Sequence, residues 1–156
     1  MKVIFLDIDG VLNSREYDRH RNWNELTNID ETRMPLVKEI VEKTGAKIVL
    51  SSTWRDGWNE NEALCDEDGR YINDIFKKFN LSIYSKTPDF GLAAVRRDEV
   101  AAWLQETEDT IENFVIIDDY RFGWAELSDN FVKTNPVKGL GLEKEHVKKA
   151  IEILNE

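Results

Sequence analysis

Three short apolar runs, each followed at once by polar residues, constrain the fold of this chain more than any other feature. Val3–Leu6, Lys47–Leu50 and Phe114–Ile117 each have the length of a buried strand. Helix-length segments separate these runs, and continuous apolar strands of this kind are typical of a parallel sheet covered on both faces. The sequence therefore predicts an α/β domain built as a three-layer, open parallel sheet.

Weaker patterns complete the expected order of elements. Two further strands are expected at Leu81–Tyr84 and Phe131–Lys133. Apolar residues recur at helical spacing in four segments, which predicts helices over 31–44, 71–79, 96–106 and 143–154. Residues 13–30 are polar and lack periodicity, so we expect a short loop or minimal cap inserted there.

Length, charge and cysteine content exclude several classes of protein. A chain of 156 residues fits a single domain, 1–156. The formal net charge of −10 disfavours a broad nucleic-acid-binding surface. Cys65 stands alone, which excludes a disulfide framework and a cysteine-based zinc site. Because the apolar runs are too short for a membrane span or a signal peptide, we expect a cytoplasmic monomer.

Polar side chains follow the three strong strands, and the carboxyl ends of parallel strands form the edge at which such sheets bind ligands. Asp7 and Asp9 are two positions apart, so both can face one cavity while Ile8 packs away from it. Gly10 then allows the backbone to turn and to approach a ligand closely. The other polar residues at this edge are Ser51, Ser52, Asp118 and Asp119. Clustered carboxylates repel one another without a cation, and an all-oxygen site suits Mg²⁺.

These residues carry a family resemblance. Val-Ile-Phe-Leu-Asp-Ile-Asp-Gly-Val-Leu-Asn at 3–13 resembles motif I of the haloacid dehalogenase-like (HAD) phosphohydrolases, and Ile-Ile-Asp-Asp at 116–119 resembles their motif IV. Ser51 or Ser52 resembles motif II. More narrowly, Gly-Ala-Lys-Ile-Val-Leu-Ser-Ser-Thr-Trp-Arg at 45–55, together with the segment 96–104 and the late acidic pair, is similar to the HAD domains of Swiss Army Knife RNA repair proteins.

The resemblance implies a role for each acid. Asp7 would be the nucleophile that forms an aspartyl-phosphate. Asp9 would protonate the leaving group, then activate water, and would also ligate the metal through its backbone carbonyl. Asp119 would be the main Mg²⁺ ligand, with Asp118 acting on the metal through water or orienting other groups. One of the two serines would donate a hydrogen bond to a phosphoryl oxygen.

The resemblance also requires a motif III cation, which balances the carboxylates and the phosphoryl group. Arg96 shares a helical face with Val100, and Arg97 shares one with Leu104, so periodicity does not separate the two arginines. Resemblance to the narrower family favours Arg96. We assign substrate contacts to Gly10, Ser52, Arg55 and Arg97.

The expected activity is Mg²⁺-dependent hydrolysis of a phosphomonoester, on a phosphorylated small molecule or a nucleic-acid terminus. Arg15, Arg19, Arg21 and Arg55 suggest a locally basic mouth that could admit such a terminus. One alternative is a catalytically silent regulatory module that retains the acidic pocket. A receiver-like signalling domain is disfavoured, because a receiver places its acidic pair, rather than its phosphate acceptor, after the first strand.

Side chains away from the strand ends are interpreted more simply. Trp103 lies in an apolar helical stripe and is expected in the core. Trp58 lies in a polar segment and is interpreted as an exposed contact or as lid packing. His20 and His146 lack partners at ligand spacing and are interpreted as surface residues. The acidic stretch 60–68 is expected to be a solvated loop.

Overall fold

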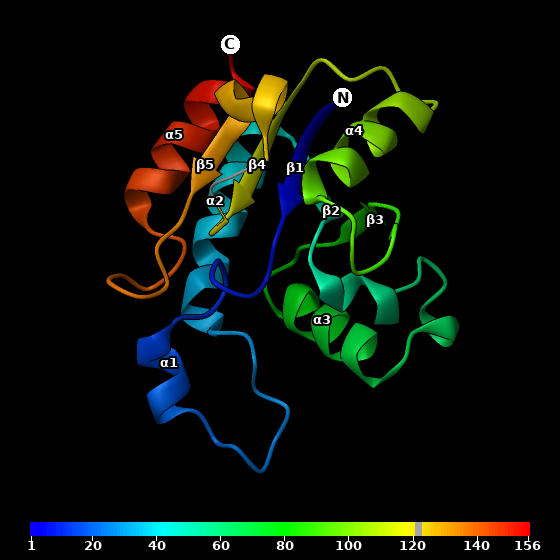
Figure 1. Cartoon of the computed structure of the whole chain (residues 1–156). Coiled ribbons are helices and arrows are strands. Elements are labelled where there is room, and N and C mark those ends of the chain that lie inside the picture. The colour runs from blue at the N-terminus through cyan, green and yellow to red at the C-terminus, as the bar shows by residue number, and fades with distance from the viewer. Residues whose placement is uncertain (121–122) are drawn as a thin grey trace.

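A computed structural model describes residues 1–120 and 123–156. Its centre is a five-stranded sheet in the order β3-β2-β1-β4-β5, and all four strand pairings are parallel (Figure 1). The strands are β1 (Lys2–Leu6), β2 (Lys47–Leu50), β3 (Ile83–Lys86), β4 (Asn113–Asp118) and β5 (Phe131–Lys133). The predicted open parallel sheet is thus confirmed.

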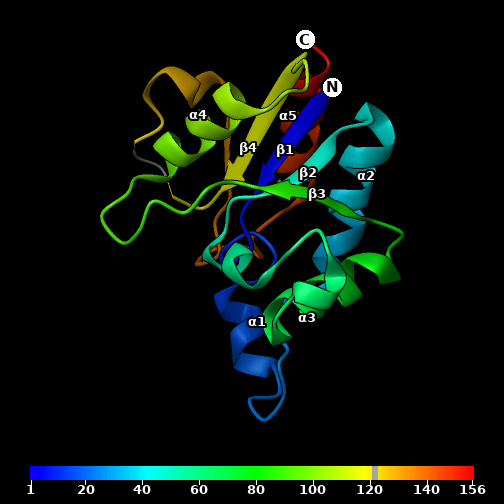
Figure 2. The same ribbon diagram turned by 90° about the vertical axis from the view of Figure 1, so that its right-hand side faces the viewer.

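Helices cover both faces of this sheet. The α-helices are α1 (Arg15–His20), α2 (Met34–Thr44), α3 (Glu67–Lys78), α4 (Arg96–Glu106) and α5 (Lys144–Leu154). The described residues also form the short 3₁₀ segments η1 (Glu31–Arg33), η2 (Thr53–Gly57), η3 (Glu62–Leu64) and η4 (Ala125–Asn130). Figure 2 shows α4 on one side of the sheet with α2 and α5 on the other, which gives the three layers that the sequence predicts.

Strand alternation divides the buried residues into two cores. Ile4 and Leu6 of β1 belong to the larger core, which includes the apolar faces of α2, α3 and α5. Val3 and Phe5 belong to the core under α4, where the rings of Phe5 and Trp103 pack edge to face with their centroids 5.4 Å apart. Successive residues of each strand therefore face opposite layers, and this alternation decides where the polar residues that follow the strands point.

Several predicted boundaries are corrected. The helix expected at 71–79 begins at Glu67, because the side chain of Asp66 accepts a hydrogen bond from the Gly69 N–H and caps it. The acidic stretch 60–68 is consequently not a solvated loop throughout, since it includes η3 and the first turn of α3. The strand expected at Leu81–Tyr84 lies two residues later, and the insert 13–30 contains the helix α1.

Two side chains that the sequence analysis interprets as exposed or peripheral are instead largely buried and hydrogen-bonded within the protein. Trp58 is 5% exposed and donates a hydrogen bond to Asn73, so the interpretation as an exposed contact is wrong. His146 is not a surface residue: its side chain is only 11% exposed, and its Nδ1 accepts the Glu143 N–H at the start of α5. Trp103 lies in the core, as predicted.

Within the described residues, no helix has the length and apolarity needed to cross a bilayer.

Candidate active site at the carboxyl edge of the sheet

Strand register places three polar side chains next to one another at the carboxyl edge. Leu6 is in register with Leu50 and with Ile117, so the residues that follow them, Asp7, Ser51 and Asp118, are adjacent. The Asp7 N–H bonds to the Ile117 carbonyl and the Ser51 N–H to the Leu6 carbonyl, which extends the pairing by one residue. Asp7, Ser51 and Asp118 each lie two positions after a residue of the core under α4 (Phe5, Val49 and Ile116, respectively). Side chains two positions apart on a strand point the same way, so these three face the α4 layer.

Arg96, the first residue of α4, reaches two of these groups. Its Nη1 lies 2.5 Å from Asp118 Oδ2 and 3.2 Å from Asp7 Oδ2. Arg97 instead pairs with Asp98 and with Glu126 on the molecular surface. The geometry therefore favours Arg96 as the cation of the site, and it does not bring Arg97 to the acids.

Asp119 completes an acidic cluster with Asp7 and Asp118. Each of the three offers a carboxylate oxygen, and these atoms all lie within 4.8 Å of one another. Gly10 adopts φ +84°, and a Cβ at that position would lie 2.4 Å from Asp119 Oδ2. Gly10 is thus required because the Asp119 carboxylate packs directly against its backbone.

The cluster is short of positive charge. Burial raises the pKa of Asp7 to about 8, with the Asp118 carboxylate adding to the increase and Arg96 opposing it. Burial, followed by the Asp118 carboxylate, also raises the pKa of Asp119. Three carboxylates around one guanidinium group are the donor set and the charge balance that suit a hard divalent cation, so the residues present fit Mg²⁺.

Asp9 lies outside this cluster and is exposed. Its Oδ1 accepts a hydrogen bond from Asn13 Nδ2 at 3.0 Å, and its Oδ2 accepts one from Trp54 Nε1 at 3.1 Å. Asn13 also accepts the Gly10 N–H and donates to the Asn28 carbonyl, so it ties the turn after β1 to the insert. The sequence pattern assigns no role to Asn13, although this residue closes the motif I segment.

Ser51 and Ser52 differ in whether their hydroxyl groups already have a hydrogen-bond partner. Ser51 is fully buried, and its Oγ has no hydrogen-bond partner within residues 1–120 and 123–156. Ser52 caps η2, where its Oγ accepts the Trp54 N–H. An unpartnered buried hydroxyl beside Asp7 is available to a bound phosphoryl oxygen, whereas the Ser52 hydroxyl already serves as a cap.

The structure does not support Arg55 as a substrate contact. Arg55 is 3% exposed, and its Nη2 pairs with Glu99 at 2.7 Å in a buried ion pair. Its other nitrogens donate to the carbonyls of Ser51, Ser52 and Thr87. Arg55 therefore joins the end of β2 to α4, and its donors are satisfied by the protein itself.

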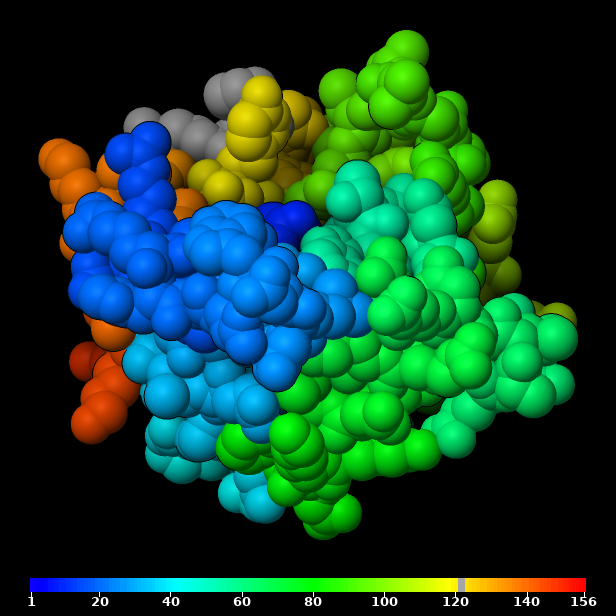
Figure 3. Space-filling view, turned by 90° about the horizontal axis from the view of Figure 1, so that it is seen from below, coloured from blue at the N-terminus to red at the C-terminus, as the bar shows by residue number. Residues whose placement is uncertain are grey.

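The expected basic mouth is also weaker than the sequence suggests. Arg19 pairs with Glu16, and Arg21 pairs with Asp18 and stacks over the Trp23 ring. With Arg55 buried, most of these guanidinium groups are already neutralised. Figure 3 shows the insert as blue atoms at the carboxyl edge, beside the dark-blue segment that follows β1.

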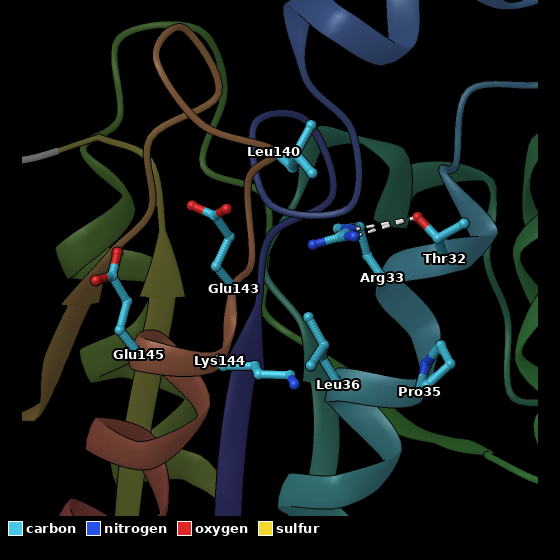
Figure 4. A pocket seen from close by; sticks show the side chains of 8 residues that line it. All are labelled: Thr32, Arg33, Pro35, Leu36, Leu140, Glu143, Lys144 and Glu145. Carbon is cyan, nitrogen blue, oxygen red and sulfur yellow. Dashed lines mark hydrogen bonds between the residues drawn. The ribbon is translucent and has the colours of Figure 1, made fainter.

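Two hollows lie near this edge. One, of about 570 Å³, lies between the starts of α2 and α5 and is lined by Arg33, Leu140, Glu143 and Lys144 among others (Figure 4). Its lining includes none of the clustered acids, and Arg33 there already donates to Thr32 and to the Leu142 carbonyl. The other, of about 810 Å³, is lined in part by Arg96, Asp118 and Asp119, and so belongs to the candidate active site.

An open parallel sheet in this order, with acids after β1 and β4 gathered at one edge, is the Rossmann-like core of a haloacid dehalogenase-like domain. Comparison with protein families matches residues 3–147 to the HAD domain in Swiss Army Knife RNA repair proteins, and the chain belongs to this family. No curated protein and no solved structure matches the chain.

Proposed function

We propose that this protein is a Mg²⁺-dependent phosphatase that hydrolyses a phosphomonoester through an aspartyl-phosphate on Asp7. One observation carries the proposal: Asp7, Asp118, Asp119 and Arg96 converge at the carboxyl edge of the sheet. Membership of the family supports phosphatase-type chemistry.

In the first step, a carboxylate oxygen of Asp7 attacks phosphorus, and the bond from phosphorus to the leaving oxygen breaks. Asp9 donates a proton to that oxygen, so the leaving group departs as an alcohol. In the second step, Asp9 takes a proton from water, which attacks phosphorus and releases inorganic phosphate from Asp7. Asn13 and Trp54 hold the Asp9 carboxylate during both proton transfers.

Two groups of the chain would stabilise the charge on the phosphoryl oxygens. Arg96 offers its guanidinium group, and Ser51 offers a buried hydroxyl that has no partner among the described residues. Mg²⁺ held by Asp7, Asp118 and Asp119, with the Asp9 carbonyl, would supply further positive charge when bound. The candidate substrates are phosphorylated small molecules and nucleic-acid ends, and the second class is included because the family name refers to RNA repair proteins.

The proposal is tested with p-nitrophenyl phosphate and the Asp7→Asn variant. We expect turnover that needs Mg²⁺ and falls at least about a thousandfold in Asp7→Asn, because the nucleophile is lost. Arg96→Gln should lose at least about a hundredfold, whereas the matched surface variant Arg97→Gln should stay within about twofold of the wild type.

Beryllofluoride binding gives a readout that does not depend on turnover. The wild type should be trapped in the presence of Mg²⁺, and Asp7→Asn should not. Turnover without Mg²⁺, or full activity of Asp7→Asn, would contradict the proposal. Mg²⁺-dependent phosphate binding without trapping or turnover would instead identify a catalytically silent module.

A further inference from the structure

The groove of about 810 Å³ opens directly from the acid cluster, and the proposed hydrolysis does not by itself explain it. Arg96, Asp118 and Asp119 contribute to its wall. Glu99 of α4 also lines it, and the rest of the described wall comes from residues within the segments that follow β2 (53–56), β3 (89–95) and β4 (120 and 123–124). In Figure 3 the yellow atoms that follow β4 lie beside the light-green atoms of the segment before α4.

The volume of the groove indicates what part of a substrate it holds. Pockets for small molecules measure about 300–1,000 Å³, and a single phosphoryl group would fill only a small part of this one. Since the reacting phosphoryl group belongs at Asp7, the space that extends from Asp118 and Asp119 is available to the group bonded to phosphorus. That group is the leaving group of the hydrolysis.

Part of the wall is apolar and exposed to water. Leu92 is fully exposed, and the exposed fractions of Val95 and Tyr120 are 48% and 57%. Trp124 also lines the groove but is only 3% exposed, and its Nε1 donates a hydrogen bond to the Tyr120 carbonyl. A ligand with an apolar or aromatic surface would remove Leu92, Val95 and Tyr120 from water, which is favourable because it buries apolar surface.

The charged part of the wall is acidic. Its described residues include five carboxylates and two guanidinium groups. Both guanidinium groups are already paired: Arg55 with Glu99 at 2.7 Å and more distantly with Asp89 at 3.8 Å, and Arg96 with Asp7 and Asp118. Further along the wall, burial and then the neighbouring Asp89 carboxyl group raise the pKa of Asp56. Among the described residues of the wall beyond the acidic cluster, a second negative charge on a substrate would therefore meet Asp56 and Asp89 rather than a free cation.

We infer that the groove binds the leaving group of the substrate, and that this leaving group is compact, partly apolar and free of negative charge. A nucleoside belongs to this class. The adjoining phosphates of a nucleic-acid strand do not, because they would bring negative charge to the acidic wall. The inference rests on the proposed hydrolase activity.

The charge requirement is tested by comparing kcat/KM for phenyl phosphate and 4-carboxyphenyl phosphate. The wild type should prefer phenyl phosphate. Asp89→Asn keeps an oxygen that can accept the Gly91 N–H but removes a charge, so the ratio of 4-carboxyphenyl to phenyl phosphate should rise about threefold to tenfold. Glu108→Gln removes an exposed charge outside the groove and should leave the ratio unchanged.

The apolar requirement is tested by comparing phenyl phosphate with methyl phosphate. Leu92→Ser should lower the ratio of their kcat/KM values about threefold or more, since the ring loses an apolar contact. The matched control is Leu64→Ser, because Leu64 is also exposed, at 67%, but lies in η3 outside the groove lining. This control should leave the ratio unchanged.

The outcomes separate the inference from the proposed function. If the wild type with Mg²⁺ hydrolyses none of these esters, the proposed function fails. If it hydrolyses them but neither ratio changes in Asp89→Asn or Leu92→Ser, the assignment of the groove is wrong. A 5′-phosphorylated oligonucleotide should also be compared with the matching nucleoside monophosphate at 0.15 M salt, where the Debye length is about 8 Å. A higher kcat/KM for the oligonucleotide would overturn the assignment of the groove.

Discussion

At the scale of single residues, hydrogen bonds rather than sequence spacing determine which side chains can do chemistry. Asp7 and Asp9 are two positions apart, yet only Asp7 belongs to the acidic cluster. Asp9 is exposed and has one hydrogen-bond donor on each oxygen, Asn13 on one and Trp54 on the other. The two acids are therefore in different environments, which fits one for attack on phosphorus and the other for proton transfer.

Trp54→Phe tests the role of Trp54 in positioning Asp9. The variant keeps an aromatic ring beside Tyr71 and removes the N–H that Asp9 accepts. We expect kcat for methyl phosphate to fall about tenfold, within the roughly 10²–10⁴-fold that a general acid contributes. The fall for p-nitrophenyl phosphate should be smaller, because its leaving group needs little protonation, and KM should change little for either ester.

Trp103→Phe is the matched control, because Trp103 also donates its indole N–H, to Ser85, but lies away from the acids. It should lower stability without altering the ratio of the two kcat values. An equal loss for both esters in Trp54→Phe would argue that Trp54 supports only the fold.

At the scale of elements, end caps and ion pairs fix how helices meet the sheet. The Arg55–Glu99 pair ties η2 to α4, and Glu99 also accepts the Phe90 N–H. Because Arg96 begins α4, this buried pair also helps to hold α4 in the position from which Arg96 reaches Asp7 and Asp118. At the start of α5, Glu143 and His146 form reciprocal capping hydrogen bonds.

The cap of α5 makes stability depend on pH. Burial lowers the pKa of His146 below its usual value near 6.5, and its Nδ1 must be unprotonated to accept the Glu143 N–H. The unfolded chain therefore binds the proton more readily, so this contribution to the free energy of unfolding is present above pH 6.5 and is lost as the pH falls through the lowered pKa. We expect a loss of about 1 kcal/mol, typical of a helix cap.

Urea unfolding between pH 7 and pH 5 measures this effect, at values that bracket the ordinary histidine pKa of about 6.5. His146→Gln supplies an acceptor that does not titrate, so its stability should fall less over that range than the stability of the wild type. His20→Gln changes an exposed histidine and should match the wild type. If His146→Gln and the wild type have the same pH dependence, the cap does not titrate as described.

At the scale of the whole molecule, parallel packing gathers negative charge at one edge of the domain. The ends of β1 and β4 bring Asp7, Asp118 and Asp119 together. Among the described residues, Arg96 is the only cationic side chain that forms salt bridges with Asp7 and Asp118. The acids lie at the carboxyl ends of β1 and β4, which are paired within the sheet, so a cation that relieves their repulsion should stabilise the entire fold.

Thermal unfolding of the metal-free protein tests this consequence without an activity assay. Mg²⁺ at about 100 times its Kd should stabilise the wild type by about 2.7 kcal/mol, which corresponds to an increase in Tm of roughly 5–10 °C for a domain of this size. Asp119→Asn should lose most of the increase, whereas Asp129→Asn, an exposed acid of η4, should retain it. No Mg²⁺-induced increase in the wild type, or an equal increase in Asp119→Asn, would contradict the metal site.

The sequence by itself determined the parallel α/β class and the location of the acids, because buried strands require apolar runs and their polar ends must meet at one edge. Tertiary structure decided which charged side chains enter the site. Periodicity could not choose between Arg96 and Arg97, since each shares a helical face with apolar residues, and only the packing of α4 turns Arg96 toward the acids. Arg55 likewise follows β2 as a substrate contact would, but Glu99, which is distant in sequence, holds it inside the protein. Such pairings depend on contacts between elements, which the local pattern of a sequence does not encode.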